Sequence, residues 1–385
     1  MNCDVVIIGG GIAGLCTAYY LLKAGQRVTL IEKDQVGRAA SWAGGGILSP
    51  LRPWAYSDWH HELTDQSLSC LDEITATLHR AGLHFERNYS GMLYLNEPKS
   101  DKLLAWLNKS NAQFHWLENQ ELRRLLESLE LHSLSSIAQS AVWAPSVSNI
   151  RNPQYIQALK TYLQQQPKFS LMEHTRASII FDQSAEPEAI SQVRGIEINQ
   201  VSGHQVIQCE RVIITAGPWS STLLTAIDSN SQQLQSVQPI RGQMIAYRPQ
   251  LPLKTIIMHQ DHYIIPRADG LILVGSTLER VGFDQGVTAT AEAALMTFAV
   301  SILPELTGQK PLHHWSGLRP VITGQEGIPF IGQIAGTQGL WMNTGHFRNG
   351  IVHAPGSADR LVRAMIKAQE LKPVVAQSIR PIPVF

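Results

Sequence analysis

Three glycines near the start of the chain have a spacing that suits phosphate binding. Gly9, Gly11 and Gly14 form a GxGxxG pattern, and Glu32 follows 18 residues after the last of them. In such a pattern the first glycine permits a tight turn, the second lets the backbone approach a pyrophosphate, and the third lets a helix pack closely on a strand. A carboxylate at the distance of Glu32 accepts hydrogen bonds from adenosine ribose hydroxyls and disfavours the 2′-phosphate of NADP. The pattern predicts a dinucleotide site and leaves FAD and NAD open.

A second candidate for chemistry is a lone cation in an apolar setting. Arg319 lies between Leu318 and Pro320, in a chain whose charged residues make up only 16%. A carboxylate in a dry pocket needs a partner, and a guanidinium offers two parallel donors that also fix its orientation. An arginine beside a proline is also typical of a surface position or a structural ion pair. The residue type alone leaves both interpretations open.

The elements that must position the glycines form a βαβ unit. Residues 4–8 have the short β-branched run of a buried strand, residues 12–24 the apolar run of a helix, and residues 27–32 the pattern of a second strand. The pyrophosphate would then meet the N-terminus of the helix, where free N–H groups and the helix dipole favour negative charge.

Further turns along the chain help to decide between FAD and NAD as the bound dinucleotide. Residues 39–50, 212–217 and 343–352 are each rich in glycine or small residues. NAD needs one nucleotide fold and little more, whereas the larger isoalloxazine ring of FAD would use several such turns. The sequence therefore favours FAD.

Composition and charge exclude several classes of protein. The net charge is zero and no basic stripe is present, so no nucleic acid is expected as a partner. The four cysteines are scattered and lack the spacing of a metal site, so no metal is expected. No run of 18 apolar residues occurs, so we expect no integral membrane segment and a cytoplasmic protein.

At this point the chain resembles a known group of flavoproteins. The matching segments cover most of the chain in order and are VVIIGGGIAGL, IEKDQVGRAASWAGGGILSPL, RNPQYIQAL, VIITAGPWS, PIRGQMIAY, HYIIPR, LILVGSTLE, GLRPVITGQEGIPFIG and GHFRNGIVHAPGSA. They are similar to the D-amino acid oxidase superfamily of FAD-dependent oxidoreductases and, within it, to the glycine oxidases of the thiamine-biosynthesis type. Leu278 stands where close relatives can have methionine, which predicts a change in one pocket wall.

The resemblance implies an α/β fold with two domains. A Rossmann-like FAD-binding domain, discontinuous in the sequence, would be joined by a second, β-rich α+β substrate domain. The FAD-binding domain would comprise 1–84, 143–226 and 316–370 with the C-terminal helix, the substrate domain 85–142 and 227–315, and the tail 371–385.

The resemblance also implies bound FAD. No histidine lies in the second glycine loop and no cysteine lies beyond Cys209, so the FAD is expected to be non-covalent. Most of the expected contacts are glycines and small residues of the turns, and the acidic contact Glu32 is followed by Lys33. The expected contacts are Gly9, Gly11, Ile12, Ala13, Gly14, Glu32, Lys33, Ala40, Ser41, Gly45, Gly46, Ile47, Ala177, Ala216, Gly217, His346, Phe347, Arg348, Asn349, Gly350, Ile351 and Val352.

Three residues are expected at the substrate. The resemblance places Arg319 as the clamp on the substrate carboxylate, Tyr263 as a hydroxyl that also reaches it, and Arg348 near the flavin and the substrate. The expected reaction is hydride transfer from the α-carbon of a small amino acid to the flavin, which needs no strong side-chain base. The imine product would hydrolyse or supply thiazole synthesis, and oxygen would accept the electrons to give hydrogen peroxide.

Several alternatives stay open from the sequence. Glycine, sarcosine and small D-amino acids all remain as substrates, and the oligomeric state is open, a homo-oligomer included. A D-amino acid dehydrogenase that passes electrons to a membrane quinone is an alternative activity, and a non-catalytic flavin-binding module is an alternative class. The segment 49–59, rich in tryptophan and proline, is interpreted as a lid or entrance.

Overall fold

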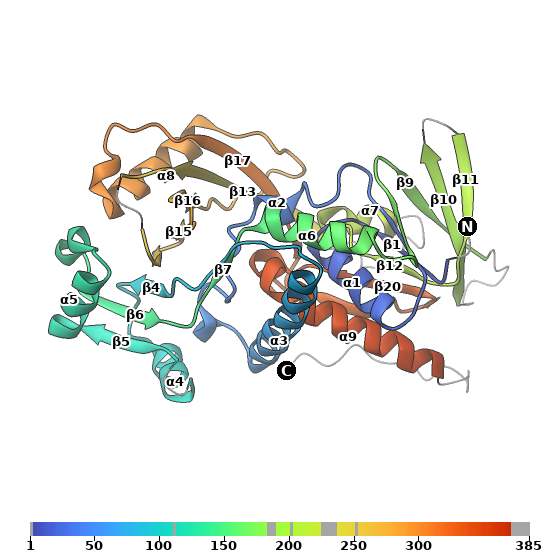
Figure 1. Cartoon of the computed structure of the whole chain (residues 1–385), viewed down its shortest axis with the longest axis horizontal. Helices are drawn as coiled ribbons and strands as arrows, with labels where there is room; N and C mark the ends of the chain where they lie inside the picture. The colour runs from blue at the N-terminus through green and yellow to red at the C-terminus, as the bar shows by residue number, and fades with distance from the viewer. Residues whose placement is uncertain are drawn as a thin grey trace.

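The computed structural model describes residues 3–110, 113–182, 190–200, 203–224, 237–250 and 253–370. The tail expected at 371–385 lies outside the described residues. Figure 1 shows two β-sheets in opposite halves of the molecule, with helices packed against each of them. The predicted α/β class, with an FAD-type nucleotide fold and a second β-rich part, is confirmed.

The first sheet has six strands in the order β18–β20–β12–β1–β2–β8. Neighbouring strands run parallel except β18, which is antiparallel to β20. This arrangement brings the carboxyl ends of five parallel strands to one edge, where ligands bind in open α/β sheets. The strands are β1 (Val5–Ile8), β2 (Val28–Ile31), β8 (Phe169–Met172), β12 (Val212–Ile214), β18 (Phe330–Gln333) and β20 (Leu340–Thr344).

Both faces of this sheet are covered, which explains why β1 is apolar at every position. Val5 and Ile7 pack into a core with the helices of one face, and Val6 and Ile8 pack into another core with three strands on the opposite face. The predicted βαβ unit is confirmed. The helices are α1 (Ile12–Lys23), α3 (Asp58–Arg80), α6 (Asn152–Gln164) and α9 (Gly350–Glu370), and the strands are β9 (Arg176–Phe181), β10 (Ser191–Gln200) and β11 (Gly203–Gln208).

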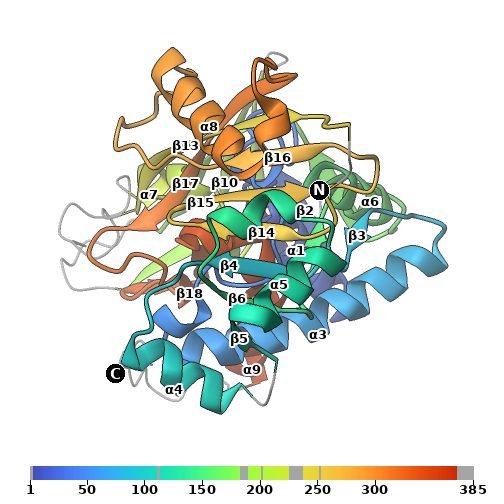
Figure 2. The same ribbon diagram turned by 90° about the vertical axis from the view of Figure 1, so that its left-hand side faces the viewer.

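The second sheet has eight strands in the order β17–β13–β16–β15–β14–β4–β6–β5. Figure 2 looks onto its outer side, where α5 (Asn119–Ser128) and α8 (Ala289–Ile302) lie in front of the strands. The strands are β4 (Met92–Leu95), β5 (His115–Glu118), β6 (Ser140–Ala144), β13 (Val237–Tyr247), β14 (Ile256–His259), β15 (His262–Pro266), β16 (Ile272–Gly275) and β17 (His313–Ile322).

Alternation along these strands decides which side chains face the first sheet. Ile264 packs into the outer core with α8, whereas Tyr263 and Ile265 pack into the inner core. Met244 of β13 also lies in that inner core, and Trp315 of β17 packs against it. Arg319 is four residues after Trp315, so it shares the inner face.

The predicted boundary between the domains at residue 315 falls inside β17. This strand pairs with β13 from His313 to Ile322 without interruption. The division of the chain into domains stays a prediction. The remaining elements are α2 (Ala40–Ala43), η1 (Pro53–Ala55), β3 (Arg87–Asn88), α4 (Asp101–Lys109), η2 (His132–Ser136), β7 (Asn149–Ile150), η3 (Gly217–Trp219), α7 (Ser220–Leu224), η4 (Pro304–Leu306), β19 (Thr337–Gln338) and η5 (Phe347–Asn349).

None of the helices in the described ranges combines the length and the apolar composition needed to cross a membrane.

Candidate functional site

A cavity of about 780 Å³ lies between the two sheets. One wall is formed by the turns that follow β1, β2, β12 and β20, at the carboxyl edge of the six-stranded sheet. The other wall comes from the inner face of β13, β15 and β17 in the eight-stranded sheet. The cavity therefore joins the predicted nucleotide site to the predicted substrate site.

The glycine loop has a geometry that only glycine satisfies at two of its positions. Gly9 has a φ of +114°, and a Cβ atom there would lie 2.6 Å from the backbone carbonyl of Thr215. A Cβ atom on Gly14 would lie 2.1 Å from the carbonyl oxygen of Gly9. These contacts let α1 begin directly against the end of β1, as the dinucleotide pattern requires.

Glu32 holds this loop in shape from the end of β2. Its Oε2 atom accepts a hydrogen bond from the backbone N–H of Gly10 at 2.7 Å, and its Oε1 atom accepts one from Asp34 at 3.0 Å. The second glycine-rich loop is tied to the first, because Ser41 Oγ accepts a hydrogen bond from the N–H of Ile12 at 3.0 Å. Glu32 and Ser41 both line the cavity.

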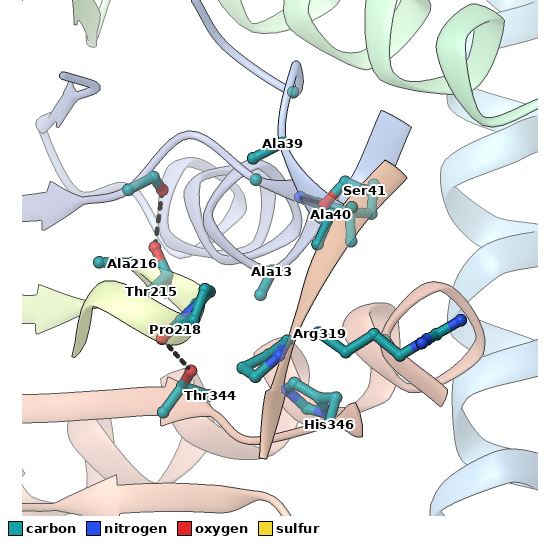
Figure 3. A pocket seen from close by; sticks show the side chains of 18 of the residues that line it. Ala13, Ala39, Ala40, Ser41, Thr215, Ala216, Pro218, Arg319, Thr344 and His346 are labelled. Carbon is teal, nitrogen blue, oxygen red and sulfur yellow. Dashed lines mark hydrogen bonds between the residues drawn. The ribbon is translucent and has the colours of Figure 1, made fainter. Parts of the chain in front are cut away.

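Threonines at the ends of β12 and β20 connect the remaining turns (Figure 3). Thr215 Oγ1 donates a hydrogen bond to the carbonyl oxygen of Gly9 at 2.7 Å, and Thr344 Oγ1 donates to that of Gly217 at 3.2 Å. Both threonines line the cavity and were not among the predicted site residues. Each could have been found in the sequence as a threonine that ends or directly follows a buried strand, where that strand leads into a glycine turn.

His346 lies in the turn after β20 and also lines the cavity (Figure 3). Its Nε2 atom lies 2.8 Å from Oδ1 of Asn343, so a proton on Nε2 can be donated to that amide oxygen. Burial lowers the pKa of His346 to about 4, so the ring is neutral near pH 7. Its Nδ1 atom is buried and has no hydrogen-bond partner among the described residues.

Most residues predicted to contact FAD line this one cavity, and three do not. Gly14 packs on Gly9, Val352 lies in the core between the helices, and Asn349 is buried behind the cavity wall. Those that line it are Gly9, Gly11, Ile12, Ala13, Glu32, Lys33, Ala40, Ser41, Gly45, Gly46, Ile47, Ala177, Ala216, Gly217, His346, Phe347, Arg348, Gly350 and Ile351.

The residues present fit FAD. The cavity reaches the N-terminus of α1, where Gly11 lines it without a side chain, so the backbone there is open to a pyrophosphate. Glu32 lines the cavity with a carboxylate that can accept from ribose hydroxyls, and Nδ1 of the neutral His346, which lacks a partner among the described residues, is an acceptor in a wall further along. A single continuous cavity, running from Glu32 to Arg319, suits a long dinucleotide with a reactive ring at one end.

Arg319 faces this cavity from β17 and is half-buried. Its Nη1 atom donates to the carbonyl oxygen of Thr277 at 3.1 Å, and its Nη2 atom donates to Ser276 Oγ at 2.8 Å. In the part of the chain that the structure describes, no carboxylate lies within ion-pair distance of it. Burial lowers the pKa of Arg319, and nearby Tyr263 opposes that change.

The guanidinium of Arg319 rests on a residue without a side chain. A Cβ atom at Gly242 would lie 2.1 Å from Nη1, 2.2 Å from Nη2 and 2.3 Å from Cζ of Arg319. Gly242 is on β13, the strand that pairs with β17. The absence of a side chain at Gly242 therefore creates the space that the arginine fills, a role that the sequence analysis missed.

Tyr263 and Arg348 complete the group of predicted substrate residues. Tyr263 is buried on β15, and its hydroxyl donates to Ser276 Oγ at 3.1 Å. Arg348 lies on the other side, in η5, with its guanidinium 5.6 Å from the ring centroid of Phe347. All three predicted residues line the same cavity, and Arg348 is close enough for its charge to lower the pKa of Arg319 further.

The predicted change in a pocket wall at Leu278 is wrong. Leu278 is 46% exposed and does not line the cavity, because the chain turns outward after Thr277. The apolar wall is formed instead by Met244 and Leu51. No pattern in the sequence indicated that Met244 forms the cavity wall, since alternation along a long strand does not reveal which face of the strand meets a second domain.

The segment 49–59, interpreted as an entrance, contributes Ser49 and Leu51 to the cavity. Arg52 anchors this segment through an ion pair with the buried Glu97, with an N–O distance of 2.8 Å. The segment is thus fixed to the end of β4, beside the turn that leads into Tyr263. Its role as a lid stays a prediction.

Replacing Glu32 by alanine is expected to weaken FAD binding by about tenfold or more, since two hydrogen bonds that shape the loop are lost with the ribose acceptor. The measurement is the flavin-to-protein absorbance ratio after purification, followed by titration of FAD into the flavin-free protein. Glu62→Ala, at an exposed position of α3, is the matched control and should retain FAD fully. Equal retention in both variants would contradict the assignment of Glu32.

Comparison with known proteins gives a consistent result. The family model of FAD-dependent oxidoreductases, DAO, matches residues 4–364. Among curated proteins, a glycine oxidase of Pseudomonas aeruginosa is 36% identical, with 96% of each chain covered, and a bifunctional ThiO/ThiG protein of Trichormus variabilis is 28% identical over 98% of this chain and 54% of its own length. Among solved structures, glycine oxidase from Bacillus cereus has a TM-score of 0.79 at 26% identity, with 96% of each chain covered.

Proposed function

The chain belongs to the DAO family of FAD-dependent oxidoreductases, and from this premise we propose that it oxidises glycine or a similar small amine. The substrate class comprises glycine, sarcosine and small D-amino acids, and the products are the imine or 2-oxo acid and hydrogen peroxide. The similarity to glycine oxidases along the full length of this chain supports the proposal.

The observation that carries the proposal is the state of Arg319. It is a cation at the wall of a largely apolar cavity, and no carboxylate of the described residues forms an ion pair with it, although Glu279 lies near enough to favour its charge. A buried charge without a partner is costly, so the site is suited to a ligand that brings an anion. Of its five N–H groups, one donates to the carbonyl oxygen of Thr277 and one to Ser276 Oγ, so a guanidinium in this position still has N–H groups to offer a carboxylate.

The geometry suggests how the residues serve the reaction. FAD, held by the glycine loop, Glu32 and Ser41, would supply the redox chemistry of an amine oxidation. Arg319 holds the carboxylate and, with Tyr263, fixes the direction in which the α-carbon points. Met244 and the ring of Tyr263 exclude water, and an apolar surrounding favours the neutral amine over the ammonium ion. Arg348 adds positive charge at the opposite wall.

The product and the partners follow from the same proposal. We propose that oxygen is the acceptor and that the imine supplies thiazole synthesis in thiamine formation, as the similarity to a bifunctional ThiO/ThiG protein suggests. The alternative of a D-amino acid dehydrogenase that passes electrons to a membrane quinone is not favoured, since relatives at 36% and 34% identity are glycine oxidases. A cytoplasmic location and assembly into a homo-oligomer stay predictions.

The decisive experiment measures peroxide release by the purified yellow protein with glycine, sarcosine, D-alanine and L-alanine. Glycine or sarcosine is expected to give the highest kcat/KM, because the space beside Arg319 is limited by Met244 and Tyr263. A protein that is reduced by D-alanine but transfers electrons only to a quinone analogue would support the alternative activity. A colourless protein that binds NAD would contradict the proposal altogether.

A further inference from the structure

One hydroxyl group connects the two predicted carboxylate-binding residues. Ser276 follows β16 and is only 3% exposed. Its Oγ atom accepts a hydrogen bond from Nη2 of Arg319 at 2.8 Å and another from the hydroxyl of Tyr263 at 3.1 Å. Ser276 does not itself line the cavity, so it would act on a substrate only through these two neighbours.

The hydrogen atoms of this group can be counted. A serine hydroxyl has two lone pairs and one hydrogen, and the two bonds from Arg319 and Tyr263 occupy both lone pairs. Tyr263 also has a single hydroxyl hydrogen, and it points toward Ser276. In this arrangement Tyr263 has no hydrogen to offer a carboxylate in the cavity.

We propose that Ser276 is a positioning residue that couples Arg319 to Tyr263 and permits both to bind the substrate carboxylate. This inference rests on the proposed function, because it requires a ligand that carries a carboxylate. When the carboxylate arrives, Tyr263 turns its hydrogen to the ligand, and Ser276 donates its own hydrogen to the oxygen of Tyr263. Ser276 continues to accept from Arg319 throughout, so each hydroxyl keeps one donated bond.

The contacts that hold Arg319 in place explain why Tyr263, and not the arginine, changes its hydrogen-bond partner. The other terminal nitrogen of Arg319 is fixed by the carbonyl oxygen of Thr277, and the guanidinium rests on Gly242. The arginine therefore cannot follow the ligand by moving as a whole without losing these contacts. A hydroxyl that both accepts and donates is the group that allows Tyr263 to change partners, and connected hydrogen bonds of this kind strengthen one another.

The first test is Ser276→Ala in the FAD-bound protein. Without the acceptor, Nη2 of Arg319 and the hydroxyl of Tyr263 both lose their partner, so we expect KM for glycine to rise by about 10- to 30-fold. The expected change in kcat is less than about threefold, since the reacting atoms are untouched. The dissociation constant of acetate, measured by titration calorimetry, should rise in parallel with KM.

A double-mutant cycle separates coupling from simple loss of packing. In a Tyr263→Phe background, Ser276→Ala should raise the acetate dissociation constant by only about threefold, because the link to the tyrosine is already broken. Ser276→Cys keeps the size but has a weaker acceptor, so its constants should lie between those of the wild type and Ser276→Ala.

Ser67→Ala is the matched control. Ser67 is a fully buried serine of α3 whose Oγ donates to the carbonyl oxygen of His353 and accepts from the N–H of Gly356. The variant should be less stable to urea and should leave KM and acetate binding within twofold of the wild type.

Two results would overturn the inference. One is an unchanged KM and acetate affinity in Ser276→Ala, and the other is the same loss in the presence and absence of the tyrosine hydroxyl. The proposed function fails separately, because a wild-type protein that does not oxidise glycine can still be titrated with acetate. If such a protein also fails to bind acetate, the coupling inference is wrong as well.

Discussion

Replacing Arg319 by alanine is expected to lower kcat/KM for glycine by about 100- to 1,000-fold while FAD stays bound. The substrate carboxylate would then be buried opposite a neutral wall, and leaving one member of a buried charge pair alone costs about 3–5 kcal/mol. Most of the effect should appear in KM, because the cation binds a group that does not react. Peroxide release over a wide range of glycine concentration measures both constants.

Two further variants make the Arg319 result specific. Arg319→Lys retains the charge but loses the planar pair of donors, so it should recover part of the affinity and stay below the wild type by about tenfold or more. Arg194→Ala removes an exposed arginine that pairs with Asp182 on the far side of the nucleotide fold, and it should leave both constants unchanged. A normal KM in Arg319→Ala would show that another residue holds the carboxylate.

Replacing Gly242 by alanine is expected to reproduce much of the Arg319 defect, with a loss in kcat/KM of about 30- to 100-fold. The added methyl group would occupy the place of the guanidinium, 2.1–2.3 Å from its atoms, so the arginine must leave its hydrogen bonds to Ser276 and Thr277. Nothing in the backbone conformation of Gly242 resists an alanine, because its φ is not in the left-handed region.

The control for Gly242 is another strand glycine. Gly332 of β18 also lacks a positive φ, and a Cβ atom there would meet no atom within 4 Å, so Gly332→Ala should be silent. The sharper test is the double variant. In an Arg319→Ala background the alanine at 242 has room, so it should cause little further loss. If Gly242→Ala lowered kcat/KM by the same factor with and without Arg319, Gly242 would act through something other than the arginine.

The spacing of residues in the sequence indicated the nucleotide half of the site directly, whereas the substrate half was indicated only by resemblance, and the reason is physical. Gly9, Gly14 and Glu32 lie within one local βαβ unit, so their spacing along the chain reflects their positions in space. The contacts of Arg319 come from residues 42 to 77 positions away in the chain, and only strand pairing brings them together. No local pattern indicates that Gly242 must lie beneath a guanidinium.

The expectation for Leu278 was wrong because this residue lies where the chain leaves a strand. Leu278 was expected at a pocket wall because its neighbours match the family pattern, yet it is exposed two residues beyond Ser276. Tyr263 was expected at the site from the resemblance alone, because alternation inside β15 could not say which face meets the other sheet. The predicted roles of Arg319, Tyr263 and Arg348 stay predictions until the variants are measured.

The cavity draws its walls from two sheets, and this has a practical consequence for engineering. The turns that would hold the nucleotide belong to one scaffold, and the strands that would hold the amino acid belong to the other. A mutant library confined to β13, β15 and β17 would explore new amine substrates while the flavin content of each clone stays constant. Yellow colour would then serve as an internal standard for folding, and selection could act on substrate preference alone.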